Sequence, residues 1–171
     1  MYYTGIGSRE TPEEVLKSFI RIAKYLAKEG YTLRSGGADG ADLAFEHGCY
    51  MANGNMEIYL PWKGFNNSKS NLVVSEGKAF EIAAKYHPYW HNLKDGAKKL
   101  QARNSHQVLG LDLNTPSSFV ICWTKGGKDI GGTAQAIRIA RDYKIKVFNA
   151  GGYDTVIAFE KDLAKYLKSG E

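Results

Sequence analysis

The chain has 171 residues, a length that fits one ordinary domain rather than two. Its 43% apolar and 24% charged residues are typical of a globular protein and exclude a disordered or collagen-like chain. No apolar run approaches the ~20 residues of a membrane span, so we expect no membrane partner. Lysine and arginine number 23 against 18 acidic residues, and this net charge of +5 suits an anionic small molecule better than nucleic acid.

The N-terminal segment and the two cysteines predict a cytoplasmic protein. Residues 1–5 enter a strand-like segment at once, with no basic leader or apolar signal core, so no export is expected. Cys49 and Cys122 stand far apart within apolar segments. This placement predicts two buried free thiols in a reducing compartment.

The first half of the chain predicts three strands and two helices. The strands are expected at residues 2–6, 31–34 and 56–60. The residues Thr11-Pro12-Glu13-Glu14 have the form of a capping box with Thr11 as N-cap, and the helix that follows ends near Gly30. A second helix with a stripe of small residues follows the glycine-rich segment 35–40. Residues 62–71 are polar and without periodicity, which indicates a loop.

The second half predicts four helices and two strands. The helices are expected at 79–86, 94–109, 134–142 and 154–167, and the last strand at 146–148. Residues 118–123 form a continuous apolar run, as expected for a central strand covered on both faces. Strands that alternate with helices predict an α/β fold with an open parallel sheet and right-handed crossovers, in one domain over residues 1–171.

Three glycine-bearing loops each follow a predicted strand and lead into a predicted helix, at residues 5–9, 35–40 and 125–133. In an open parallel sheet such loops gather at the carboxyl ends of the strands, where ligands bind at the switch in strand order. Glycine lets backbone amides approach an anion, and a helix N-terminus adds a positive dipole end. One such loop is explained by a tight turn, whereas three together predict a site for a phosphate-bearing ligand.

Four short motifs resemble the SLOG superfamily in their order and spacing. They are Gly7-Ser8-Arg9, the segment Ser35-Gly36-Gly37-Ala38-Asp39-Gly40-Ala41-Asp42, Arg103-Asn104 and Gly131-Gly132-Thr133. The resemblance spans about residues 3–150 and is closest to the YspA-like branch and to the Rossmann-like core of the DNA-processing protein A family. It implies a Rossmann-like fold, with helices on both faces of the sheet, that binds nucleotides or nucleotide-derived ligands. The superfamily also contains the cytokinin-activating phosphoribohydrolases.

The resemblance implies which residues form the ligand site. Gly132 and Thr133 would hold a phosphate with backbone amides and a hydroxyl, the glycines of segment 35–40 would shape the opposing wall, and Ser8 and Arg9 would close the site. The expected ligand-binding residues are Gly7, Ser8, Arg9, Ser35, Gly36, Gly37, Asp39, Gly40, Asp42, Arg103, Asn104, Gly131, Gly132 and Thr133.

Two acids, Asp39 and Asp42, are the candidates for a catalytic role, which the sequence leaves unassigned. Either acid could instead only stabilise the first turn of the following helix. As a site residue, one of them would accept ribose hydroxyls or stabilise an oxocarbenium-like centre, and Asp39 is expected to face the sugar. The phosphoribohydrolase motif continues with glutamate, whereas Ala134 and Gln135 follow Thr133 here. The missing carboxylate argues against that particular hydrolysis.

Arg103 and Asn104 lie in the predicted helix 94–109. Asn104 falls on the apolar stripe of this helix, so its side chain must find partners in the core or in a ligand. Arg103 could pair with phosphate in the forked geometry of a guanidinium, or it could bridge a surface acid.

Two histidines, His87 and His91, are four residues apart, a spacing that invites a metal site. Pro88 argues against the helix that would place both on one face, and no cysteine or carboxylate cluster completes a site. We therefore expect no metal and no cofactor. Four aromatic residues nearby are expected to cover the core or to stack on a base: Trp62, Tyr86, Tyr89 and Trp90.

The leading prediction is binding of a nucleotide-like small molecule, for sensing, sequestering or slow processing, by a protein expected by analogy to form a homodimer. The second hypothesis is single-stranded DNA binding like that of the DNA-processing recombination mediator. The modest charge and the absence of a basic stripe with interleaved aromatics weigh against it. Two more hypotheses are hydrolysis of the N-glycosidic bond of a nucleoside phosphate and a role as an interaction protein with a vestigial pocket.

Overall fold

Six strands form one parallel sheet in the computed structural model, which describes residues 1–170. They are β1 (Tyr2–Gly5), β2 (Thr32–Ser35), β3 (Met56–Leu60), β4 (Leu72–Val73), β5 (Phe119–Cys122) and β6 (Lys146–Asn149). Their order across the sheet is β4-β3-β2-β1-β5-β6, and every pairing is parallel. The chain thus runs from the middle outward to β4 and then crosses back to place β5 beside β1. The strand order reverses between β1 and β5, which is where open α/β sheets bind ligands.

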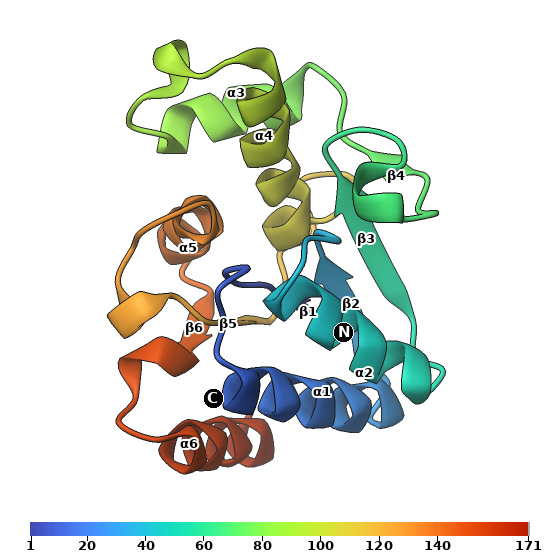
Figure 1. Cartoon of the computed structure of the whole chain (residues 1–171), viewed down its shortest axis with the longest axis vertical. Helices are drawn as coiled ribbons and strands as arrows, with labels where there is room; N and C mark the ends of the chain where they lie inside the picture. Colours follow the sequence, from blue (N-terminus) through green and yellow to red (C-terminus); the bar gives the residue numbers. More distant parts are fainter. Residues whose placement is uncertain (171) are drawn as a thin grey trace.

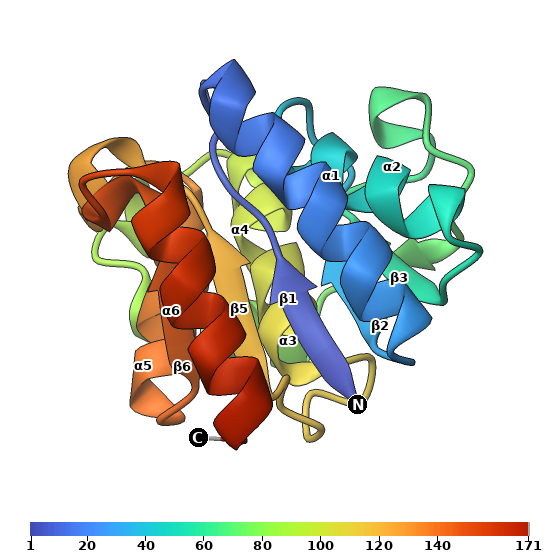
Figure 2. The same cartoon turned by 90° about the horizontal axis from the view of Figure 1, so that it is seen from below.

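Helices cover both faces of this sheet, as predicted. They are α1 (Glu13–Lys28), α2 (Ala41–Met51), α3 (Lys78–Tyr86), α4 (Asp95–Leu109), α5 (Thr133–Asp142) and α6 (Val156–Ser169). Helices α1, α2 and α6 lie on one face, and α3, α4 and α5 lie on the other (Figures 1 and 2). The α/β architecture with a parallel open sheet is therefore confirmed.

Strand β5 shows why a continuous apolar run predicts a central strand. Phe119 and Ile121 pack into the core on the side of α1, α2 and α6, whereas Val120 and Cys122 pack into the core on the opposite side. All four residues are buried because successive side chains of a strand point to opposite faces and both faces are covered.

The predicted capping box at the start of α1 is wrong. Pro12 is the residue that precedes α1, and no side chain caps the helix. The Thr11 hydroxyl instead donates to the Ser8 carbonyl at 2.6 Å, and the Thr11 N–H bonds to the same carbonyl. Thr11 therefore braces the loop after β1 and does not cap the helix.

Strand β4 and four short 3₁₀ helices were not predicted from the sequence. The short helices are Phe65–Asn67, Trp90–Asn92, Lys125–Gly127 and Ala150–Gly152. Elements of two or three residues are too short to show a period, so pattern reasoning assigns them to loops.

The prediction of two buried free thiols is confirmed for Cys49 and Cys122. Burial raises the pKa of Cys49 to about 11 and that of Cys122 to about 12, so both remain protonated and unreactive at neutral pH.

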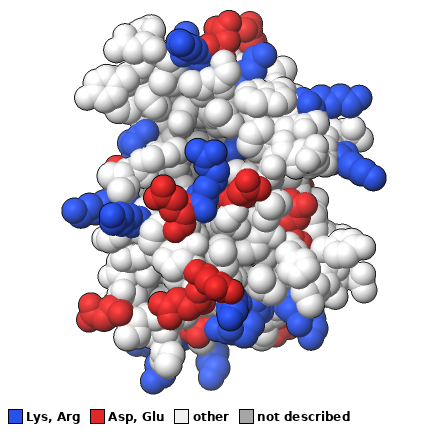
Figure 3. Space-filling model, in the orientation of Figure 1, with Lys and Arg blue, Asp and Glu red and all other residues white. Residues whose placement is uncertain are grey.

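None of the helices within residues 1–170 combines the length and the apolar character needed to cross a membrane. Figure 3 shows that basic and acidic side chains are interspersed on the face that it presents.

Candidate functional site

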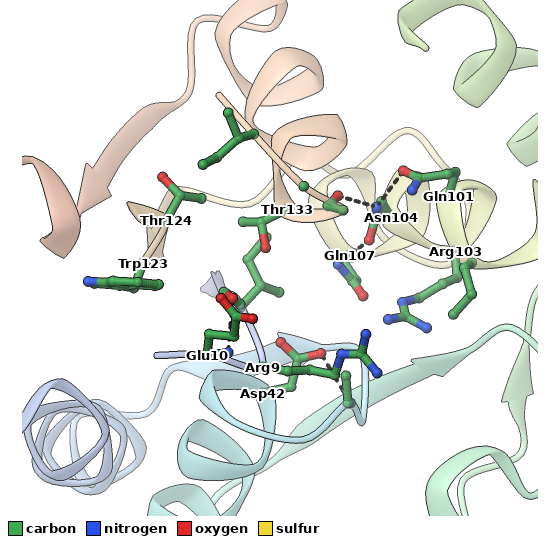
Figure 4. Close-up of a pocket in the computed structure, with 18 of the residues that line it drawn as sticks. Arg9, Glu10, Asp42, Gln101, Arg103, Asn104, Gln107, Trp123, Thr124 and Thr133 are labelled. Carbon is green, nitrogen blue, oxygen red and sulfur yellow. Dashed lines mark hydrogen bonds between the residues drawn. The ribbon is translucent and has the colours of Figure 1, made fainter. Parts of the chain in front are cut away.

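A cavity of about 500 Å³ lies where the strand order reverses (Figure 4). Its walls come from the loops that follow β1, β2 and β5, from α4 and from the start of α5. Two of the three predicted glycine loops, at residues 5–9 and 125–133, contribute several residues each, and the loop after β2 contributes Ala38. The carboxyl ends of parallel strands meet at one edge of the sheet, so segments far apart in sequence form one site.

The structure brings together most of the predicted ligand-binding residues. Nine of them line the cavity: Gly7, Ser8, Arg9, Asp42, Arg103, Asn104, Gly131, Gly132 and Thr133. The other five lie at the end of β2 and in the loop after it, outside the cavity lining: Ser35, Gly36, Gly37, Asp39 and Gly40.

Several residues of the cavity were not singled out from the sequence. They include Glu10, Phe65, Leu100, Gln101, Gln107, Trp123 and Thr124. Gln101 and Gln107 could have been found, because residues three positions before and after Asn104 share its face of a helix. Phe65 carries no such signal, since a loop between β3 and β4 brings it to the site.

The loop after β1 requires glycine at position 7. A Cβ atom there would lie 2.7 Å from the Ala41 Cβ and 3.1 Å from the Trp123 backbone nitrogen. The next residue, Ser8, donates its N–H to the Trp123 carbonyl at 3.2 Å. Gly7 thus lets this loop pass between the start of α2 and the end of β5, and it brings Ser8 and Arg9 to the cavity.

The loop after β2 supports the site from behind. The Ser35 hydroxyl donates to the Gly5 carbonyl at 2.6 Å and joins the ends of the two central strands. The Asp39 carboxylate accepts a hydrogen bond from Asn66 Nδ2 at 2.9 Å, and the same amide donates to the Gly37 carbonyl at 3.0 Å. Asp39 therefore holds the Phe65–Asn67 turn against this loop.

Arg103 on α4 is buried in the cavity wall near Asp42. Its side chain is 7% exposed, and neither Nε nor Nη1 has a hydrogen-bond partner among the described residues. No acid within residues 1–170 forms an ion pair with it, and its Cζ atom lies 5.3 Å from the centre of the Phe65 ring. Burial lowers the pKa of the guanidinium, and Asp42 opposes this effect. Buried donors of this kind call for a partner that a ligand can supply.

Asp42 in the first turn of α2 is the buried acid of the cavity. It is 3% exposed, and its Oδ2 accepts the Ala38 N–H at 3.2 Å. Burial raises the pKa of Asp42 to about 6, although Arg103 and the N–H groups of Ala38 and Gly7 favour the charged form. A strongly perturbed acid in a cavity is typical of a functional site.

A row of amide side chains joins α4 to the start of α5. Gln107 Nε2 donates to Asn104 Oδ1 at 2.9 Å, and Asn104 Nδ2 donates to the Gly132 carbonyl at 3.2 Å and to Gln101 Oε1 at 3.4 Å (Figure 4). Asn104 thus finds the polar partners that its position on the helix demands. The Oε1 atom of Gln107 is left buried and without a partner.

The N-terminus of α5 forms the remaining wall. Helix α5 begins at Thr133, and in its first turn the Ala134 and Gln135 N–H groups already bond to the Gly131 and Gly132 carbonyls, at 3.2 and 3.3 Å. Gly131, Gly132 and Thr133 all line the cavity, so this positive dipole end lies at the site. An anion is favoured here.

The histidine pair has no metal-site geometry in the described part of the chain. His87 follows the last residue of α3, and its Nδ1 accepts the Tyr89 N–H at 3.1 Å. Within residues 1–170, no three histidine, cysteine or acidic side chains gather in a group that could hold a metal ion. Trp90 packs edge-on against Phe80, whereas Tyr89 is largely exposed.

The fold and the cavity define a Rossmann-like α/β protein with a cavity at its strand switch. DNA processing protein A from Helicobacter pylori, a single-stranded DNA-binding protein, is similar to this chain with a TM-score of 0.57 and 21% identity. The similarity covers 87% of this chain and 64% of that one, so the chain spans less than two thirds of that protein. The Moco carrier protein from Chlamydomonas rheinhardtii is similar with a TM-score of 0.52 and 18% identity, over 88% of this chain and 74% of that one.

Neither a protein-family model nor a curated protein matches the sequence. The likeness to the two solved structures supports the Rossmann-like fold that the motifs predict. At this level of identity, the likeness concerns the fold alone.

Proposed function

We propose that the protein binds a nucleotide or a nucleotide-derived small molecule in the cavity between the ends of β1 and β5. The observation that carries this proposal is that Arg103 and Gln107 are buried and keep polar atoms without a hydrogen-bond partner, in a cavity that also receives a helix N-terminus. The volume of about 500 Å³ is in the range of small-molecule sites. A ligand with a phosphate for the helix N-terminus and a polar ring system for the unpartnered atoms of Arg103 and Gln107 would suit this cavity.

The charges around the cavity agree with a ligand of small negative charge. Three basic residues, Arg9, Arg103 and Lys125, face two acids, Glu10 and Asp42. We place the phosphate at Gly132 and Thr133, with Ser8 and Arg9 on the opposite side. A cytoplasmic location and a homodimer, expected from the free thiols and by analogy, complete the proposal, and light scattering would give the oligomeric state.

Nucleotides are expected to raise the melting temperature of the protein. A ligand that binds only the folded state at a hundred times its Kd stabilises it by about 2.7 kcal/mol. The measurement is thermal unfolding with millimolar AMP, GMP, IMP and ADP-ribose, supported by titration calorimetry and by native mass spectrometry of the protein as purified. A panel that gives neither a thermal shift nor binding heat would overturn the proposal.

Single-stranded DNA binding is the second candidate, because the similar DNA processing protein A binds such DNA. The interspersed charges of the face in Figure 3 and the net charge of only +5 disfavour it, since sequence-tolerant DNA binding uses a continuous basic groove.

DNA binding is therefore expected to be weak near physiological salt. Binding of a labelled oligonucleotide should appear only at low salt and fall steeply as the salt concentration rises, through counterion release. Fluorescence anisotropy across a salt series measures this. Sub-micromolar binding at physiological salt would reverse the order of the two candidates.

A further inference from the structure

Three buried polar groups converge at one place beside Gly36. A Cβ atom on Gly36 would lie 2.2 Å from Gln107 Oε1, 2.8 Å from Arg103 Nε and 2.9 Å from Asp42 Oδ2. Each of the three side chains is more than nine-tenths buried, and each lines the cavity. Figure 4 shows them directed toward the same part of the cavity from α2 and α4. Glycine is required at position 36, because any side chain there would clash with these three groups.

The hydrogen bonds that these groups already make determine what a ligand must offer. Gln107 donates through Nε2 to Asn104 Oδ1, so its unpartnered Oε1 atom is an acceptor. Asn104 is itself oriented by its donation to the Gly132 carbonyl, which fixes the direction of the row. Arg103 offers two unpartnered donors, Nε and Nη1. The ligand must therefore supply an acceptor that can serve both Arg103 donors and, beside it, a donor for Gln107.

A phosphate fits this position poorly. Its oxygens would accept from Arg103 but would also face the Gln107 oxygen and the Asp42 carboxylate, which are both acceptors. Like charges and facing acceptors are costly where water is excluded. The pKa of Asp42, raised by burial to about 6, leaves this group mostly ionised at neutral pH. A neutral group with a carbonyl and an adjacent N–H meets neither obstacle.

The geometry points to a base-recognition subsite in which Arg103, Gln107 and Asp42 bind the lactam edge of a guanine-, hypoxanthine- or uracil-type ring. The lactam carbonyl accepts from Arg103, and the ring N–H donates to Gln107 Oε1 or to Asp42. Adenine also places an acceptor beside a donor, but its ring nitrogen has one lone pair where the carbonyl oxygen has two, so it can satisfy only one of the two unpartnered Arg103 donors. The inference rests on the proposed function and deepens it to a class of base. It gives Arg103 a partner other than the phosphate or the surface acid considered from the sequence.

The test compares ligands on the unaltered protein by titration calorimetry at pH 7.5. GMP, IMP, AMP and 1-methyl-GMP share ribose and phosphate, but AMP and 1-methyl-GMP lack the lactam N–H. GMP and IMP are expected to bind about tenfold more tightly or better, because the wrong base leaves buried groups unpaired. Equal affinities for all four would overturn the inference and leave the proposed function standing. No binding of any would overturn both.

A pair of variants assigns the selectivity to the subsite. Gln107→Met removes the acceptor at similar volume, and the GMP preference over AMP is expected to fall to about onefold or twofold. Lys99→Met, on the same helix but exposed and outside the cavity, should keep the preference. Circular dichroism checks that both variants fold. If Gln107→Met does not fold, the comparison of ligands on the unaltered protein still tests the inference. A preference that survives in folded Gln107→Met would contradict the assignment.

Discussion

Replacing Thr133 with glutamate is expected to abolish nucleotide binding and leave the fold intact. Thr133 begins α5 and lines the cavity, so the new carboxylate would take the place proposed for the phosphate. Two negative groups at one site repel by several kcal/mol, which corresponds to a loss of affinity of about a hundredfold or more. The helix should not suffer, because an acid in the first turn interacts favourably with the macrodipole. Titration calorimetry with GMP measures the loss.

A matched control separates the site from the general effect of a new charge. Ala158→Glu places the same carboxylate in the first turn of α6, at an exposed position outside the cavity. This variant should bind nucleotide as the unaltered protein does. A Thr133→Glu protein with native circular dichroism and unchanged affinity would show that the phosphate binds elsewhere.

Replacing Asp42 with asparagine is expected to stabilise the protein at pH 7 although it weakens ligand binding. Burial raises the pKa of Asp42 from 3.8 to about 6, so the ionised group destabilises the folded state even with Arg103 nearby. A shift of this size corresponds to about 3 kcal/mol in the free energy of unfolding. Asparagine removes the charge at similar shape, so most of this cost should disappear. The subsite loses its carboxylate acceptor at the same time.

The stability gained by Asp42→Asn is expected to depend on pH. Above pH 6 the Asp42 carboxyl is ionised in both folded and unfolded protein, so the cost is fully present. As the pH falls from about 6 to about 4, the folded protein takes up the proton first, and the advantage of Asp42→Asn should shrink toward zero. Urea unfolding at pH 7 and pH 4 measures both values.

Asp39→Asn is the control for this pair of measurements, because Asp39 is exposed and lies outside the cavity lining. Its free energy of unfolding should change by less than about 0.5 kcal/mol at pH 7. An Asp42→Asn protein that is less stable than the unaltered one at pH 7 would show that the carboxylate is a net stabilising group.

Local patterns in the sequence were sufficient to predict the fold. The apolar run of β5 and the amphipathic helices carry their periodicity within a few residues, because alternation and helical spacing reflect which faces are covered. The glycine loops were found for a similar reason, since a strand followed by glycine and a helix is a local arrangement. Thr11 shows the limit of such patterns. Its sequence context has the form of a cap, but its hydroxyl donates to the Ser8 carbonyl of the preceding loop.

The roles of Asp39 and Asp42 differ only because of tertiary packing. The two acids are three residues apart and look alike in sequence, yet Asp39 bonds to Asn66 at the surface and Asp42 is enclosed beside Arg103. Nothing local distinguishes them, because Asn66 and Arg103 come from later parts of the chain.

The sequence by itself determined the parallel α/β sheet and the loops at its carboxyl edge. It also identified nine of the residues that line the cavity. Only the tertiary structure decided which polar atoms of the cavity stay unpartnered, and hence what a ligand must offer. Arg103 and Gln107 are ordinary polar residues on a helix in the sequence. Burial against Phe65, Gly36 and Asp42, from three other segments, leaves their atoms in need of partners. Such a need depends on distances across the fold, which no short sequence pattern contains.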